Sequence, residues 1–189
     1  MTSLATSLIR ASVVLGLLAT GLMLTSCDLS SAGSTAILNA NSTSPPVVQH
    51  RFEYTQDDVT EAGQAEVVSS IQSDDLDAIL TANGFSRSDV VSAQVDSVRV
   101  ERRSTSTLSG ADLYLGTNAN GSLIASVEFD DPEAETPARD KTSRTVTGAV
   151  KNGQKRVFAQ FDVEDPSSIP PSGGMVQAVV YYRLEVEGV

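Results

Sequence analysis

The sequence predicts an all-β protein folded as an antiparallel β-sandwich, immunoglobulin-like or jelly-roll, with about seven or eight strands. From residue 47 onward hydrophobic residues recur with a period of two, which places them on one face of a strand. Two Asn-Gly pairs, Asn120-Gly121 and Asn152-Gly153, stand between such runs, and both residue types accept the positive φ of tight hairpin turns. Only the segment near 74–83 has helical character, so the strands are not separated by helices as in a parallel α/β fold.

The first elements of the domain are short. Gln49–Thr55 and Ala65–Ile71 are the weaker strand candidates. A helix of about three turns is expected over 74–83. Ser73 can cap its start, and Asn83-Gly84 ends it because glycine accepts the left-handed conformation.

Hydrophobic residues change phase within the segment 90–103. Val91, Ala93 and Val95 share one phase, whereas Val98 and Val100 take the other. One extra residue near Asp96-Ser97, as in a β-bulge, restores a single buried face. A strand that passes from one sheet to the other at this point is the alternative.

The remaining strands alternate more clearly. Asn120-Gly121 and Asn152-Gly153 are expected to form hairpins, the second joining Val146 and Val150 to the run that begins at Val157. The last run is the longest and predicts a strand with one buried face. The four alternating sets are Ala111/Leu113/Leu115, Leu123/Ala125/Val127/Phe129, Val157/Ala159/Phe161/Val163 and Val176/Ala178/Val180/Tyr182/Leu184/Val186.

The first 27 residues have the three parts of a secretory signal sequence. A short segment ends at Arg10, an apolar stretch follows over 11–24, and the small residues Thr25 and Ser26 precede Cys27. The apolar stretch is shorter than the ~20 residues that a membrane-spanning helix needs. Leu24-Thr25-Ser26-Cys27 resembles the lipobox of bacterial lipoproteins, in which a branched apolar residue and two small residues precede a cysteine.

The resemblance implies that a diacylglyceryl group is attached to the Cys27 thiol and that a signal peptidase cleaves before this residue, leaving an acylated N-terminus of the palmitate type. Cys27 is the chain's only cysteine, so no intramolecular disulfide forms. Two or three acyl chains, at ~0.8 kcal/mol for each buried methylene, hold a protein firmly to a membrane. We therefore expect an exported protein anchored in the bacterial cell envelope, at the inner membrane, the outer membrane or the cell surface. An ordinary secretory signal that ends near a cysteine is the alternative.

Residues 28–46 are rich in small and hydroxyl-bearing side chains and show no hydrophobic period. Such a segment buries too little surface to offset its ordering entropy. We expect a flexible tether that ends at Pro45-Pro46. The chain then divides into a signal peptide over 1–26, the lipidated cysteine and tether over 27–46, and a β-sandwich domain over 47–189.

Acidic residues outnumber basic ones by 24 to 13, which gives a formal net charge of -11. A surface this negative repels phosphate groups, so we expect neither nucleic acid nor anionic lipid bound through a basic patch. The only lysines are Lys141, Lys151 and Lys155. Adaptation to high salt explains this composition, and an ordinary acidic domain from a GC-rich genome explains it equally well.

Residue types that carry catalysis or bind metals are scarce. His50, the only histidine, is expected at the surface or at a strand edge, and no serine lies in a nucleophile-elbow pattern. One histidine and a lipidated cysteine do not supply a zinc ligand set. We expect no catalytic residue and no cofactor.

Carboxylates are numerous but scattered. Calcium prefers six to eight oxygen ligands from acidic loops, yet the spacing of a dedicated calcium loop is missing here. Solvated loops are the alternative interpretation. The weak calcium candidates are Asp130, Asp131, Asp162, Glu164 and Asp165.

Four hydrophobic residues, Tyr114, Phe158, Val179 and Tyr181, are out of phase with the buried sets. If their strands adjoin, they form an apolar patch on the outer face of a sheet, where a partner or ligand binds. Cover by the helix or by a long loop is the alternative.

These observations predict a lipid-anchored, non-enzymatic β-sandwich module with a structural, assembly or ligand-binding role. Its expected partners are the membrane, through the N-terminal lipid, and an envelope protein or ligand. A periplasmic or surface hydrolase that uses loop carboxylates is one alternative, and it requires a concave pocket with converging Asp and Glu residues. A calcium-stabilised adhesion module is the other.

Overall fold

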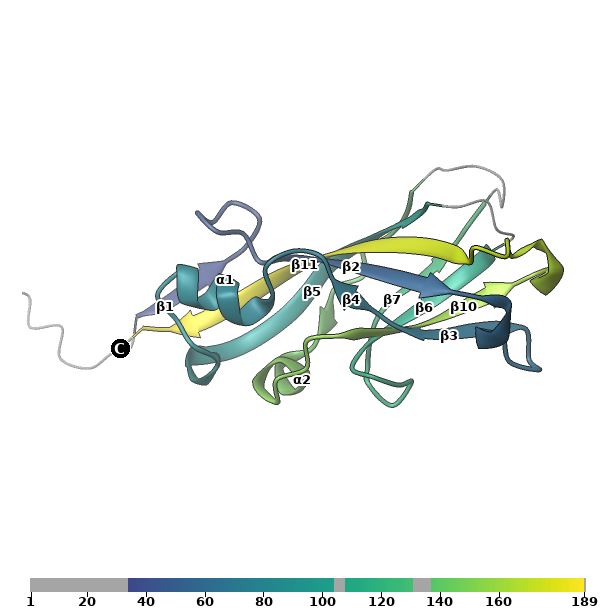
Figure 1. Ribbon diagram of the computed structural model, residues 1–189. Helices are drawn as coiled ribbons and strands as arrows, with labels where there is room; N and C mark the ends of the chain where they lie inside the picture. Colours follow the sequence, from purple (N-terminus) through teal and green to yellow (C-terminus); the bar gives the residue numbers. More distant parts are fainter. Residues whose placement is uncertain (1–33, 104–107, 131–136, 189) are drawn as a thin grey trace, which may run out of the picture. The chain divides into compact units, whose positions relative to one another are not determined.

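The computed structural model of the chain describes residues 34–103, 108–130 and 137–188. These residues form two antiparallel β-sheets whose buried faces share one hydrophobic core (Figure 1). The prediction of an all-β sandwich is therefore confirmed. The finer choice between immunoglobulin-like and jelly-roll topology stays a prediction.

The larger sheet, called sheet A here, has seven strands in the order β4-β2-β11-β5-β8, with β1 paired to β11 and β9 paired to β5. The smaller one, sheet B, has the order β3-β10-β6-β7. The strands of sheet A are β1 (Thr35–Leu38), β2 (Val47–Tyr54), β4 (Ser70–Ile71), β5 (Val90–Arg102), β8 (Ala138–Asp140), β9 (Arg144–Thr145) and β11 (Gly174–Glu187). Those of sheet B are β3 (Gln64–Val68), β6 (Leu108–Leu115), β7 (Ser122–Glu128) and β10 (Val157–Val163).

The core lies between the sheets and is formed by the alternating residues of the sequence. The six predicted inward residues of β11, from Val176 to Val186, are all buried. Phe52 on β2 meets Phe161 on β10 edge to face, with ring centroids 5.5 Å apart, and Tyr54 lies 5.6 Å from the same ring. These contacts join sheet A to sheet B, and such aromatic pairs contribute beyond the area that they bury.

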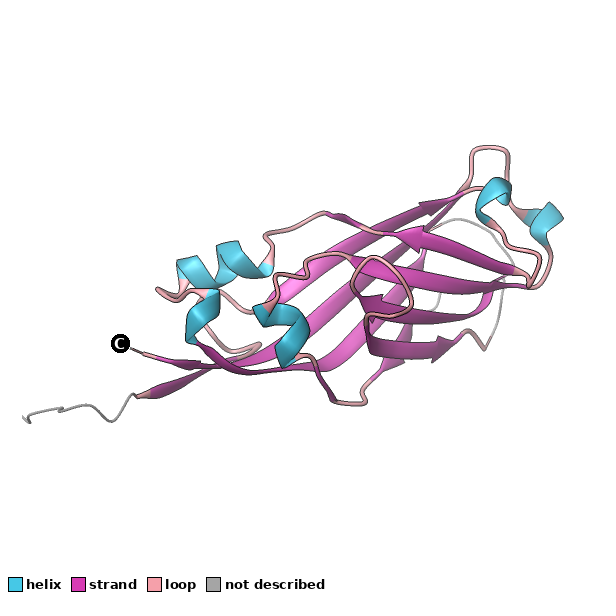
Figure 2. Ribbon diagram, turned by 90° about the horizontal axis from the view of Figure 1, so that it is seen from below, coloured by secondary structure: helices cyan, strands magenta, loops and turns pink. Residues whose placement is uncertain are grey.

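The predicted helix is present as α1 (Leu76–Ala82). Its cap is Asp75 rather than Ser73, because the Asp75 carboxylate accepts the Ala78 N–H at 3.0 Å. Gly84 follows it with φ +82°, as the predicted left-handed stop requires. The other helical segments, drawn in cyan in Figure 2, are α2 (Thr147–Lys151) and the 3-10 turns η1 (Gln56–Asp58), η2 (Arg87–Asp89) and η3 (Pro166–Ser168).

The predicted bulge in β5 is confirmed. Tyr181 and Tyr182 of β11 pair with Ser97 and Val95 of β5, so Asp96 is the extra residue. Val95 and Val98 are consequently both buried although they are three positions apart. The predicted phase is wrong at Val91, which is 46% exposed because a further register shift pairs Val90, instead of Val91, with Val186. The alternative, a strand that changes sheet at this point, is excluded because β5 stays in sheet A.

A second bulge corrects the predicted phase of β7. Leu113 pairs with Ala125, but Tyr114 pairs with Leu123, so Ile124 is the extra residue. Ile124 is fully buried, and Leu123 is turned to the outer face instead of the core. The predicted buried set is right only from Ala125 onward.

The tether predicted over 28–46 is wrong in its second part, whereas residues 28–33 lie outside the described residues. Strand β1 begins at Thr35 and pairs with Leu184–Glu187 of β11. The reason lies in β11, whose edge is paired by β2 only as far as Tyr181. β1 continues along that edge and bonds backbone groups that would otherwise be exposed.

The two Asn-Gly pairs behave differently. β6 and β7 form the predicted hairpin, but its loop spans residues 116–121 and the positive φ is at Gly116 (+148°) rather than at Gly121, so the predicted tight turn is corrected. Asn152-Gly153 instead follows α2, and the predicted strand around Val146 and Val150 is helical from Thr147. Gly153 has φ +81°, and this conformation ends a helix as readily as it forms a hairpin turn.

Candidate functional site

The outer face of sheet B carries three rows of side chains, each crossing all four strands. In every strand these residues alternate with buried ones, so they point away from the core. The rows are Val68/Phe158/Tyr114/Leu123, then Glu66/Gln160/Asp112/Ser126, then Gln64/Asp162/Gly110/Glu128. The face therefore changes from apolar to acidic along the strands, and we call it the graded face.

The apolar row is partly open to solvent. Val68 is 36% exposed at one edge, whereas Phe158 is only 8% exposed because its neighbours cover it. The rings of Phe158 and Tyr114 are 6.3 Å apart between centroids. Burial raises the pKa of the Tyr114 hydroxyl, and the negative charge of Asp112 in the next row raises it further. Apolar and acidic rows thus influence each other electrostatically.

The acidic end of the graded face encloses a hollow of about 450 Å³ above Gly110. Asp162 and Glu128 flank this glycine on the neighbouring strands, and Asp112 and Asp130 also line the hollow. A Cβ atom at position 110 would lie 2.9 Å from the Asp162 carboxylate, so glycine leaves the space in which that carboxylate lies. Asp162 also accepts a hydrogen bond from the Gln64 amide at 3.0 Å.

The graded face has no basic residue to neutralise these acids. None of the four strands of sheet B contains a lysine or an arginine. The outer face of sheet A differs, because its arginines form ion pairs such as Arg51 with Glu53 and Arg99 with Glu101. Charge is thus separated between the two faces of the sandwich, with uncompensated carboxylates on sheet B.

The predicted calcium candidates do not gather in one place. Asp130 and Asp162 line the hollow above Gly110. Asp165 instead caps η3 by accepting the Ser167 N–H at 2.9 Å, and Glu164 is exposed beside it. Asp131 lies outside the described residues. Within the described ranges, no group of three or more Asp, Glu, His or Cys side chains has the arrangement of a metal site.

The predicted apolar patch of four residues is corrected by the strand order. Tyr114 and Phe158 are neighbours on the graded face, but Val179 and Tyr181 lie on β11, on the outer face of sheet A. They belong to different sheets that pack through their other faces, so no single patch contains all four. The sequence missed Val68 and Leu123, since the period of β3 is weak and the Ile124 bulge reverses the phase of β7.

His50, predicted at the surface or a strand edge, is fully buried. β2 is an inner strand between β4 and β11, and position 50 faces the core. The ring Nδ1 forms a hydrogen bond with the Ser69 hydroxyl at 3.0 Å, whereas Nε2 has no partner among the described residues. Burial lowers the pKa of His50 to about 4, so the ring is neutral at pH 7.

A serine bonded to a histidine resembles part of a hydrolase centre, but the surroundings of this pair exclude that role. Ser69 is only 2% exposed and His50 is 0% exposed, so no substrate reaches the hydroxyl. The Ser69 oxygen also accepts the Val157 N–H at 2.9 Å. The pair is part of the hydrogen bonding of the core.

Asp140 is another buried polar group that ties the sheets together. Its carboxylate, on β8 of sheet A, accepts the N–H of Ser126 on β7 of sheet B at 3.0 Å. It also accepts the Thr142 N–H at 2.7 Å and a bond from Arg144 at 3.0 Å. Burial alone would raise the pKa of Asp140, but these hydrogen bonds outweigh it and lower the pKa to about 2.

No protein-family model matches this sequence, and no curated protein is similar to it. In the part of the chain that the structure describes, no helix has the length and apolar composition needed to cross a bilayer.

Proposed function

We propose that this chain is a bacterial lipoprotein held in the cell envelope by lipid on Cys27. The observation that carries the proposal is the motif Leu24-Thr25-Ser26-Cys27 at the end of a charged-then-apolar leader, with the chain's only cysteine at its last position. The three requirements of lipidation, a leader, small residues and a thiol, meet at one place in the sequence.

The position of β1 supports an anchor close to the folded domain. Residues 28–34 separate Cys27 from the first residue of β1, Thr35. Even a fully extended segment of this length spans no more than roughly 30 Å. β1 pairs with the last residues of β11, so the chain enters the sandwich beside Glu187. A lipid on Cys27 would hold this end of the domain near the membrane surface.

We further propose that the domain is a non-enzymatic binding module whose graded face docks a polypeptide segment with both basic and apolar side chains. The apolar row offers contact area, and the two rows beside it offer carboxylates that no lysine or arginine of sheet B neutralises. Complementary charge steers such partners and excludes acidic ones. A second copy of this chain, itself strongly acidic, is disfavoured by the same argument.

Lipidation is tested by metabolic labelling. Cells that express the wild-type chain in the presence of radioactive palmitate should give a labelled protein in the membrane fraction, and Cys27→Ser should give an unlabelled one. Ser30→Ala, a small change just beyond the motif, serves as the control and should keep the label. A Cys27→Ser protein that is still labelled or still sediments with membranes would contradict the anchor.

Docking is tested with peptides of defined composition. A short peptide of alternating lysine and valine should bind the full chain in detergent, and binding should weaken at high salt because exposed charges are screened. Tyr114→Ser should weaken binding several-fold. Tyr181→Ser removes a half-buried tyrosine from the opposite face and should leave binding unchanged. Equal loss in both variants, or equal binding of a glutamate–valine peptide, would refute docking at the graded face.

A carboxylate-dependent hydrolase is the second candidate, and the hollow above Gly110 is the observation that favours it. Asp112, Glu128 and Asp162 are among the residues that line it, and a pair of carboxylates at one pocket is what such an enzyme requires. Hydrolysis of an aryl glycoside that is abolished by both Asp162→Asn and Glu128→Gln would establish this function in place of docking. Absence of turnover in the wild-type chain would eliminate it.

A further inference from the structure

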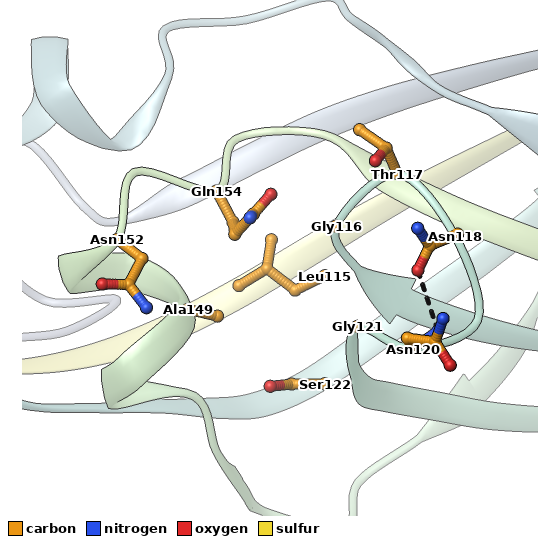
Figure 3. A pocket seen from close by; sticks show the side chains of 10 residues that line it. All are labelled: Leu115, Gly116, Thr117, Asn118, Asn120, Gly121, Ser122, Ala149, Asn152 and Gln154. Atoms are coloured by element: carbon orange, nitrogen blue, oxygen red, sulfur yellow. Dashed lines mark hydrogen bonds between the residues drawn. The ribbon is translucent and has the colours of Figure 1, made fainter.

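The structure brings Asn120-Gly121 and the asparagine of the second pair, Asn152, to one hollow, which shares no residue with the graded face. The β6–β7 turn supplies Asn120 and Gly121, and the end of α2 supplies Asn152. The hollow has a volume of about 280 Å³ (Figure 3). In sequence Asn120 and Asn152 are separated by three strands and a helix, so only the fold makes them neighbours.

The lining of this hollow is polar without being charged. Figure 3 shows Asn118 and Asn120 on one side and Asn152 and Gln154 on the other, with Leu115 and Ala149 between them. Thr117 and Ser122 add hydroxyl groups. No Asp, Glu, Lys or Arg is among the described residues that line it. Carboxamides, which both donate and accept hydrogen bonds, therefore dominate the site.

The backbone that carries these amides is held in place. Asn118 Oδ1 accepts the Asn120 N–H at 2.9 Å, and the Gly121 N–H donates to the Asn118 carbonyl at 3.1 Å. A Cβ atom at position 121 would lie 2.5 Å from the Leu115 carbonyl oxygen, so only glycine permits this close approach. The turn is thus preorganised, which lowers the entropic cost of binding.

Three of the carboxamides are available to a ligand. Within the described part of the chain, the side-chain amides of Asn120, Asn152 and Gln154 form no hydrogen bond with another residue; Asn120 is bonded only through its backbone N–H. All three residues are exposed at the rim. The available groups therefore include N–H donors and carbonyl acceptors around a small apolar floor.

We propose that this hollow binds a neutral, hydroxyl-rich small molecule of the saccharide class. Sugar hydroxyls donate and accept hydrogen bonds, and amide side chains can both accept and donate them. The half-buried Ala149 offers a small apolar contact for the C–H groups of a sugar ring, whereas Leu115 lies beneath the lining and is only 1% exposed. A charged ligand is disfavoured, because it would lose part of its hydration in the hollow and none of the described lining residues carries an opposite charge. The proposal does not depend on docking at the graded face, because the two sites share no residue.

The test is a titration of the full chain in detergent micelles, observed by NMR at the side-chain amide resonances of Asn120, Asn152 and Gln154. D-glucose and N-acetyl-D-glucosamine are the probes, and glycylglycine is the peptide comparison. At least one sugar should shift these resonances to saturation at millimolar concentration. Gln154→Glu should weaken that binding roughly tenfold or more, because it replaces an N–H donor with an acceptor.

The matched control is Gln56→Glu, which makes the same chemical change on η1, at an exposed position outside the hollow. It should leave the sugar titration unchanged. The proposal is overturned if neither sugar moves the three amide resonances, if glycylglycine alone moves them, or if Gln154→Glu and Gln56→Glu bind the sugar equally well. The NMR resonances of residues outside the hollow should be the same in Gln154→Glu and in the wild type. This result excludes misfolding as the cause of lost binding.

Discussion

His50 Nδ1 lies 3.0 Å from the hydroxyl oxygen of Ser69, the residue at which the chain passes from sheet B to sheet A. Ser69 also exchanges two hydrogen bonds with Val157, through its N–H at 2.8 Å and its hydroxyl oxygen at 2.9 Å. One buried corner therefore connects β2, β10 and the β3–β4 crossing. Because these groups are buried, each lost bond leaves a polar atom without water.

The burial of His50 predicts a pH dependence of stability. Its pKa falls from 6.5 in the unfolded chain to about 4 in the folded protein. Between these values the unfolded chain binds a proton that the folded protein does not bind, so stability rises with pH through this window. The free energy of unfolding is not reduced by this effect above pH 6.5, and it decreases by about 3 kcal/mol as the pH falls to 4. Urea unfolding at pH 7 and at pH 4.5 measures it. His50→Gln should flatten the profile in this window, and an unchanged profile would contradict the assignment.

Ser69→Ala should lower the free energy of unfolding by about 1–3 kcal/mol, because the variant leaves His50 and the Val157 N–H without their hydroxyl partner. Ser70→Ala is the matched control, because Ser70 is the next residue and is exposed. The control should change stability by less than about 0.5 kcal/mol. Equal effects of the two substitutions in urea unfolding would refute the role of the corner.

Asp140→Asn should destabilise the sandwich by about 1.5–3 kcal/mol, since a charged acceptor of three hydrogen bonds becomes a neutral amide. The pKa of Asp140 is lowered from 3.8 to about 2, so its stabilisation is complete above pH 3.8 and is lost as the pH falls through 2. Asp130→Asn, at an exposed aspartate, should have little effect. By thermal unfolding, the stability difference between Asp140→Asn and the wild type should be largest at pH 7 and should narrow at pH 2.5 as Asp140 begins to take up its proton, whereas Asp130→Asn should follow the wild type at both pH values.

Two glycines with open space around them allow the effect of backbone conformation on stability to be measured apart from the effect of packing. A Cβ atom at Gly84 or at Gly148 would meet no atom within 4 Å. Gly84 has φ +82°, so Gly84→Ala should destabilise by about 1 kcal/mol. Gly148 lies inside α2, so Gly148→Ala should stabilise by about 0.5–1 kcal/mol. Shifts of the same sign in thermal unfolding would show that conformation is not the cause.

The alternating residues predicted the sheets well because burial on one face imposes a period of two. β11 is the clearest case, and the bulge at Asp96 was predictable because Ala93 and Val95 before it and Val98 and Val100 after it each keep that period. The bulge at Ile124 was not, since Leu123 and Ile124 are equally hydrophobic and either could face the core. β1 was missed because four residues are too few to show a period, and its pairing depends on the free edge of β11.

The candidate sites depend more strongly on the fold. Tyr114 and Phe158 were identified from their phase, but their separation from Val179 and Tyr181 required the strand order. The burial of His50 had a signal in the sequence that its polarity concealed, because it shares the period-two phase of the buried residues Val48 and Phe52.

By itself the sequence determined an all-β domain, because the period of hydrophobic residues is a local property of each strand. It also contains the lipobox-like motif at Cys27, which is read from consecutive residues. Only the tertiary structure decided which strands adjoin, because pairing depends on the edges and faces that distant segments leave free. The graded face and the amide-lined hollow follow from that pairing: each gathers residues from strands or loops that are remote in sequence, and their shared chemistry exists only once the sheets are assembled.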